Sequence, residues 1–171
     1  MPLSLTQNPT PTRSHPQPHF VIRVIILVTS TLHPNQPLPL GNTEENRTHL
    51  QMLLEVALAD ENFTKQENQF LEHIAKQLGI ELEDVVHQYF DPNNITLPKQ
   101  EPKVFAFFHR LILMAIVDGE IDPKERGLLL EFGIRMGLNP SAVLEVIDYS
   151  VAHGPKAVPT EVVNIFYRYQ S

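Results

Sequence analysis

The chain has 171 residues, no cysteine and a formal net charge of −7 at pH 7. This length is enough for one hydrophobic core, and the absence of cysteine excludes disulfides, zinc–thiolate sites and thiol catalysis within it. All 20 acidic residues lie beyond position 41, together with 11 of the 13 Lys and Arg, so the body has a net charge of −9. An acidic body repels a phosphate backbone, and we therefore expect no nucleic-acid partner.

The first 41 residues differ in composition from the rest. They contain 8 of the 15 prolines and a nine-residue apolar run, Phe20–Val28. A membrane-spanning helix needs about 20 apolar residues, and the run lacks the features of a signal peptide. We expect residues 1–41 to be a disordered proline-rich tail, or the product of a start codon assigned too far upstream. Residues 42–171 are expected to form one helical domain, and a chain without cysteine suits the reducing cytoplasm.

Helical periodicity begins directly after this boundary. Apolar residues recur at i, i+3, i+4 and i+7, which predicts amphipathic helices. Glycine, proline and capping residues mark the ends of these helices. The expected helices cover residues 43–60, 64–78, 82–90, 104–117, 122–137 and 139–151, and Thr160 is expected to cap a seventh.

The first three helices resemble the next three. A shift of 58 residues gives seven identities, which include Asp60 with Asp118 and Glu67 with Glu125. Several of the identities fall at helix ends and loops, which favours an internal duplication. The sequence therefore predicts an all-α fold, a compact seven-helix bundle built from two helix–acidic loop–helix repeats.

The helix expected over residues 104–117 is apolar nearly all round, and only His109 and Arg110 are polar. Such a helix is normally the buried centre of a bundle, where His109 would be a core residue. The alternative leaves one face of this fourth helix for a partner chain, including a second copy in a homodimer.

Two acidic loops, residues 60–67 and 118–125, contain the side chains best suited to chemistry. Helix capping accounts for part of each loop, because each ends in an N-cap followed by the glutamate of a capping box. The residues that capping explains are Thr64, Glu67, Asp122 and Glu125.

The second loop also has features of a hard-cation site. Against a calcium-binding EF-hand loop, Asp118, Gly119 and Glu125 fall at positions 5, 6 and 12. Positions 1 and 3 would be Met114 and Ile116, which cannot ligate a cation. The loop is therefore not an EF-hand, and a cation would need further oxygens, such as those of the first loop.

No catalytic constellation is present in the sequence. The histidines of the body form no His-x-x-x-His or Glu-x-x-His pair, and nucleophile-elbow, phosphate-loop and dinucleotide motifs are missing. We therefore expect no enzymatic activity. A metal-dependent hydrolase that uses the same carboxylates is a distant alternative.

Two segments, Leu54-Glu-Val-Ala-Leu-Ala-Asp60 and Ala115-Ile-Val-Asp-Gly-Glu-Ile-Asp-Pro-Lys-Glu125, together resemble the TerB-like domain of the tellurite-resistance family. The resemblance implies a seven-helix bundle without established enzymatic activity, in a protein linked to tellurite or general chemical stress. It also implies that conserved acids of the family hold a divalent cation, calcium or magnesium. The matching residues here are Asp118, Glu120, Asp122, Glu125, Asp60 and Glu67.

The first loop departs from the family motif, because Glu61 replaces the glycine and Asn62 replaces the glutamate. Two functions are therefore expected. One is a stress-response protein that binds a divalent cation through its acidic loops. The other is a protein–protein interaction module, of the kind that precedes the J-domain in some co-chaperones, whose acidic loops are only helix caps. A protein partner is expected in either case, and no membrane span.

Overall fold

The structure is a computed structural model that describes residues 42–88 and 90–170. The expected tail, residues 1–41, lies outside the described residues. Within them, the regular structure is entirely helical, as the sequence predicts. The helices are α2 (Thr43–Leu58), α3 (Lys65–Leu78), α4 (Glu83–Val86), α5 (Glu101–Ala115), α6 (Pro123–Arg135), α7 (Pro140–His153), the short 3-10 helix η1 (Gly154–Lys156) and α8 (Pro159–Arg168).

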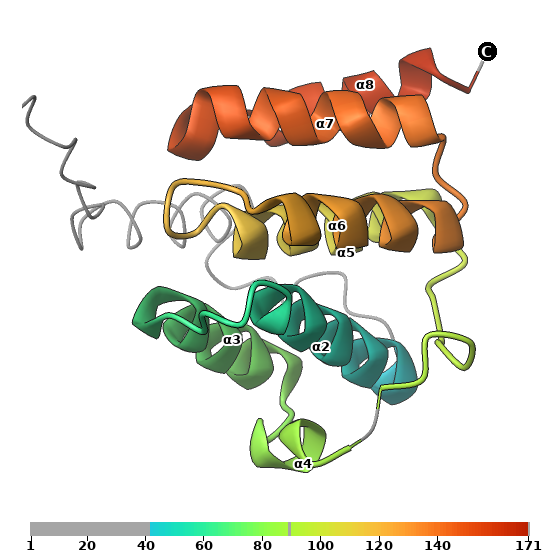
Figure 1. Cartoon of the computed structure of the whole chain (residues 1–171). Helices are drawn as coiled ribbons and strands as arrows, with labels where there is room; N and C mark the ends of the chain where they lie inside the picture. Colours follow the sequence, from blue (N-terminus) through green and yellow to red (C-terminus); the bar gives the residue numbers. More distant parts are fainter. Residues whose placement is uncertain (1–41, 89, 171) are drawn as a thin grey trace, which may run out of the picture.

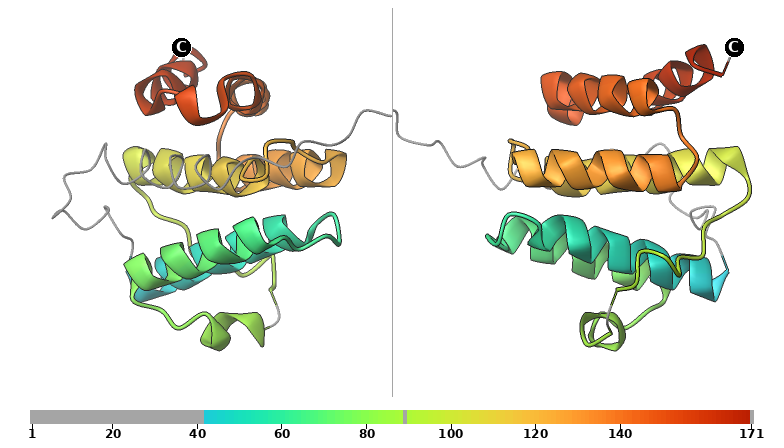
Figure 2. Two further views of the ribbon diagram at one scale, coloured as in Figure 1. Left: turned by 90° about the vertical axis from the view of Figure 1, so that its left-hand side faces the viewer. Right: turned by 45° about the vertical axis from the view of Figure 1, so that its right-hand side comes forward.

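Six of the helices stack as pairs in three layers. Figure 1 shows α2 beside α3, α5 beside α6 in the middle, and α7 beside α8, with α4 below the first pair. The two further views in Figure 2 show the same order. The middle layer holds the bundle together, because α5 packs against α2, α6 and α8.

Helix α5 is the buried centre that its apolar sequence predicts. Ten of its side chains are buried, from Val104 to Ala115, and no residue between positions 103 and 115 is exposed. Phe105 stacks on Phe166 of α8, with ring centroids 4.7 Å apart. The sequence left open a homodimer through this fourth helix. Between positions 103 and 115, α5 has no exposed residue that a second copy could contact.

Several helix ends differ by a few residues from the sequence-based expectation, and the differences at α4 and α8 have a clear physical reason. Helix α4 ends at Val86 instead of continuing to residue 90, because only Val85 of its four residues is buried. A helix this short gains little from packing. Helix α8 begins at Pro159, with Val158 as its N-cap and no side-chain capping bond, so Thr160 is not the cap. Proline at the first helical position sets the backbone angle and needs no N–H partner there.

Paired positions in the two expected repeats share unusual backbone angles. Gly79 ends α3 with a φ of 66°, and Gly137 precedes α7 with a φ of 77°. Glu61 and Gly119, also 58 positions apart, have φ of 65° and 103°. These angles are compatible with a duplication, which stays a prediction. None of the described helices is long and apolar enough to cross a membrane.

Candidate functional site: two facing acidic loops

The α2–α3 loop and the α5–α6 loop lie at the same end of the bundle (Figures 1 and 2). They do so because α2 packs on α5 and both helices run toward this end. An ion pair joins the loops, with Lys124 Nζ 3.2 Å from Glu61 Oε1. Both side chains are largely exposed, so this pair contributes about 0–1 kcal/mol. The ion pair shows that the two loops are neighbours, but it adds little to stability.

Each loop ends in a complete capping box, as predicted. In the first, the Thr64 N–H donates to Glu67 Oε2 at 2.6 Å, and the Glu67 N–H donates to Thr64 Oγ1 at 3.2 Å. In the second, the Asp122 N–H donates to Glu125 Oε2 at 2.8 Å, and the Asp122 side chain caps the start of α6. Each cap contributes about 1 kcal/mol to stability.

Each loop begins with an aspartate that folds the backbone. The Asn62 N–H donates to Asp60 Oδ1 at 2.8 Å, and the Glu120 N–H donates to Asp118 Oδ1 at 3.3 Å. An aspartate that accepts from the backbone two residues on forms an Asx turn. Capping alone left Asp118 without a structural role, and this turn supplies one. The Asp-Gly dipeptide was the signal for it in the sequence.

The residue after each aspartate adopts a left-handed backbone. Gly119, with φ of 103°, tolerates this conformation because it has no Cβ. Glu61 takes a φ of 65° in the first loop, which is uncommon for a side chain of its kind. Because Glu61 replaces the glycine of the family motif, the first loop has local backbone strain at this position that the second loop does not have.

Two glutamates of the capping boxes lie at the centre of this end of the bundle. Glu67 and Glu125 are only 4% and 5% exposed. Burial raises the pKa of Glu125 to about 8, against the hydrogen bond from the Asp122 backbone, and the nearby charges of Glu67, Asp118 and Asp60 raise it further. Burial also raises the pKa of Glu67, with smaller contributions from Asp118 and Asp60. Four carboxylates from the two loops therefore act on one another.

Four of the six predicted metal ligands, Asp60, Glu67, Asp118 and Glu125, thus influence one another electrostatically. Of the other two predicted ligands, Asp122 caps α6 and donates its backbone N–H to Glu125, and Glu120 is exposed. Among the described residues, no group of three or more His, Cys, Asp or Glu is arranged to hold a metal ion as it stands. One oxygen of each clustered carboxylate accepts a backbone N–H. A carboxylate has about four acceptor positions, so each retains capacity for a ligand.

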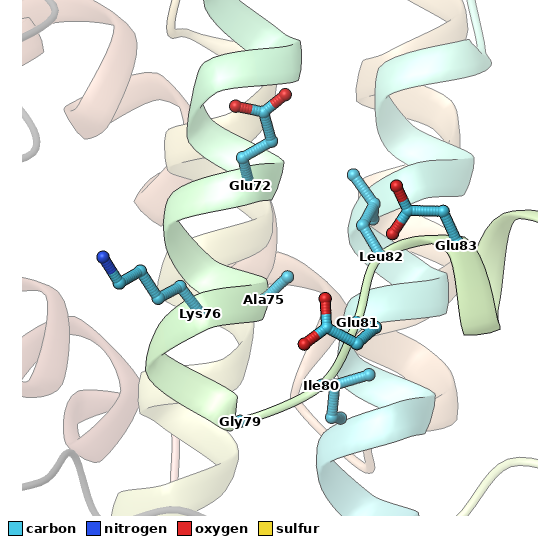
Figure 3. A pocket seen from close by; sticks show the side chains of 8 residues that line it. All are labelled: Glu72, Ala75, Lys76, Gly79, Ile80, Glu81, Leu82 and Glu83. Carbon is cyan, nitrogen blue, oxygen red and sulfur yellow. The ribbon is translucent and has the colours of Figure 1, made fainter.

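A separate cleft lies between the end of α3 and the start of α4. It has a volume of about 540 Å³, and its lining includes the apolar side chains of Ala75 and Leu82. This volume is within the range of small-ligand sites. Figure 3 shows three glutamate carboxylates around the cleft, and Lys76 extending away from two of them. These glutamates are Glu72, Glu81 and Glu83.

Comparison with known proteins finds a similarity to the N-terminal part of the described fold, from α2 to α4. The model of the family described as "Tellurite resistance protein TerB" matches residues 36–88, which include α2, the first acidic loop, α3 and α4. Among curated proteins and among solved structures, nothing matches the chain. The matched segment contains the loop that departs from the motif, so the match does not depend on the acidic loop that the resemblance stressed most. Residues 36–88 are therefore similar to the TerB family, and this match supports a TerB-like domain.

Proposed function

We propose that this TerB-like protein binds a divalent cation, calcium or magnesium, between its two acidic loops, as part of a response to tellurite or other chemical stress. The observation that carries the cation proposal is the placement of Asp60, Glu67, Asp118 and Glu125 close enough to raise the pKa values of the two buried glutamates. The stress role is supported by the family match. The match also supports binding rather than catalysis, and the lack of cysteine supports a cytoplasmic location.

The electrostatics of the cluster favour a cation. Like charges held together in a partly buried site destabilise the ionised forms. A hard dication with oxygen ligands offsets that repulsion, and calcium accepts irregular arrangements of six to eight oxygens. Binding would require the carboxylates to rearrange, because no group of three or more of them among the described residues is arranged to hold a metal ion.

A proton competes for the same site. With a pKa of about 8, Glu125 is mostly protonated at pH 7. A cation must displace this proton, so binding releases a proton and strengthens as the pH rises. We expect a weak site at neutral pH, with Kd on the order of 10⁻⁴–10⁻³ M.

The test is the melting temperature of the wild type during titration with calcium or magnesium at pH 8. Binding stabilises the folded state by RT ln(1 + [L]/Kd). Glu125→Gln and Asp118→Asn should each abolish the gain. The matched control is Glu44→Gln, which removes one exposed carboxylate at the other end of α2, roughly 20 Å away at 1.5 Å per residue. A wild type whose melting temperature does not move in 10 mM of either cation, roughly ten times the weakest Kd expected, would refute the proposal.

The cleft beside α3 favours a second candidate, a protein-interaction module whose acidic loops act only as caps. Three carboxylates beside the apolar side chains of the lining suit a partner segment that has a basic residue next to an aliphatic one. A labelled Lys/Leu peptide should bind, and a Glu/Leu peptide of the same length should not. The double variant Glu81→Gln/Glu83→Gln should weaken binding, while Glu44→Gln should leave it unchanged. Equal binding of both peptides would exclude this candidate.

A further inference from the structure

The interface between α2 and α5 buries a positive charge inside the hydrophobic core. Arg110 is 3% exposed, and His49 of α2, whose ring lies against Phe107 one helical turn before Arg110, is completely buried. Burial lowers the pKa of Arg110 to about 10, so the guanidinium stays protonated at neutral pH. Burial and the charge of Arg110 hold the pKa of His49 well below its usual value, so the imidazole is neutral. Of these two side chains, only Arg110 therefore carries a positive charge.

The aromatic ring of Phe107 lies against both groups. The His49 ring centroid is 4.1 Å from that of Phe107, and Arg110 Cζ is 5.9 Å from the same ring. A guanidinium over an aromatic ring gains about 0.5–2 kcal/mol. The effective penalty for burying a charge is several kcal/mol. Phe107 therefore offsets only part of the cost.

Several buried polar atoms of α2 and α5 have no hydrogen-bond partner in the described part of the chain. Arg110 Nη1 and both ring nitrogens of His49 have no hydrogen-bond partner. The same is true of Oδ1 of Asn46, one helical turn before His49 on α2. Among residues 42–88 and 90–170, no carboxylate forms an ion pair with Arg110. Buried polar groups in proteins are rarely left in this way.

We propose that Arg110 and His49 form a buried binding site for a small monovalent anion of halide size, such as chloride. The Arg110 guanidinium supplies the charge and an N–H donor, and the neutral imidazole of His49 supplies a second N–H. The Asn46 amide can present its NH₂ group after exchange of its two ends, which resemble each other in shape. A water molecule would satisfy the donors but would leave the charge uncompensated.

The burial of the site restricts the ligand by size. His49 and Phe107 have no exposed surface, so a ligand enters only when α2 and α5 separate briefly. A larger or doubly charged oxoanion would lose more hydration on entry and would displace the packed rings. The site lies in the core and uses none of the acidic side chains, so its occupancy is independent of the cation site.

The proposal is tested by melting temperature in cation-matched salts without calcium or magnesium. The protein is placed in sodium gluconate, which is then replaced stepwise by sodium chloride or bromide at constant ionic strength. The wild type should gain about 3–6 °C for each tenfold rise in halide above Kd. Arg110→Met should lose this gain, and His49→Phe, which keeps a ring on Phe107, should reduce it. Arg47→Met, which removes a neighbouring charge on α2, should retain it.

A wild type that melts at the same temperature in gluconate and in chloride would overturn the proposal, as would an equal halide response in Arg110→Met. Crystals grown in sodium bromide give an independent measurement that does not depend on the folding of any variant. An anomalous bromide peak within hydrogen-bond distance of Arg110 Nη1 is expected. A peak there without anomalous signal would show a buried water and would refute the anion site.

Discussion

The two acidic loops share the same arrangement of structural features but differ in some of their residues. Each has an aspartate that turns the backbone, a residue with positive φ, and a capping box that buries a glutamate. The second loop has glycine at the left-handed position, and it contains Glu125, whose pKa rises to about 8. The first has Glu61 there, and it supplies charges that act on the second. The charges of each loop thus raise the pKa of the buried glutamate in the other, although only the second loop has glycine at the left-handed position.

The comparison extends to the core, where aligned positions should matter equally. Phe108 and Leu50 are 58 positions apart and both fully buried, on α5 and α2. We expect Phe108→Ala to cost about 3–5 kcal/mol and Leu50→Ala about 2–5 kcal/mol, because each opens a cavity. Denaturant unfolding followed by circular dichroism measures both. Since α2 packs on α5, both variants should still unfold in one transition. Two separate transitions would show that the two units fold independently.

A second aligned pair should respond differently. Gly133 in α6 aligns with Ala75 of the first unit in the 58-residue shift. A Cβ on Gly133 would lie 2.5 Å from Val143 Cγ2. Gly133→Ala should therefore cost about 1–3 kcal/mol through overpacking, although the first unit has alanine at the aligned position. Gly127→Ala is the control in the same helix, because a Cβ there meets no atom within 4 Å. It should stabilise by about 0.5–1 kcal/mol, and equal effects of the two changes would contradict this packing.

The two buried glutamates should make stability depend on pH with a defined sign. The pKa of Glu125 is raised from 4.5 to about 8 on folding, so the folded protein binds more protons than the unfolded chain across that interval. Its contribution to stability is complete below pH 4.5 and is lost as the pH rises through about 8.

Glu125→Gln keeps an acceptor for the Asp122 N–H and cannot ionise. It should change stability little at pH 5 and raise it on the order of 1–2 kcal/mol at pH 8.5. Glu67→Gln should act in the same direction. Thermal unfolding across this pH range checks both, and a Glu125→Gln variant that is less stable than wild type at pH 8.5 would contradict the raised pKa.

The smallest expected effect lies at the left-handed position. Glu61→Gly removes the strain of a φ of 65°, about 1–2 kcal/mol, and adds about 0.5–1 kcal/mol of backbone entropy cost. The expected net stabilisation is about 0.5–1 kcal/mol. Gly119→Ala should do the reverse in the second loop. A destabilised Glu61→Gly variant would mean that the ion pair with Lys124 matters more than its exposure suggests.

Much of the local structure could be predicted from local sequence. Both capping boxes follow from an N-cap residue with glutamate three positions later, and the burial of α5 follows from its uninterrupted apolar run. The early end of α4 could not be predicted, because Tyr89 and Phe90 continue the helical spacing. The length of α4 depends on tertiary packing, because only Val85 of its four residues is buried.

The site itself depends on tertiary structure. That the two loops face each other follows from the packing of α2 on α5, which no local pattern encodes. The burial of Arg110 against His49 follows from the same packing. The sequence alone identified Arg110 only as one of two polar residues on an apolar helix.

The most direct test of the paired-loop site is the pKa of the Glu125 side chain, measured by carbon-13 NMR with selectively labelled glutamate. The Glu125→Gln variant assigns the signal. Without added cation, the carboxyl should titrate near pH 8, as burial and the three neighbouring carboxylates require. With saturating calcium, its midpoint should fall by more than about one unit, because the cation and the proton compete for the same oxygens. A midpoint near 4.5 without calcium, or one that calcium leaves unchanged, would contradict the account.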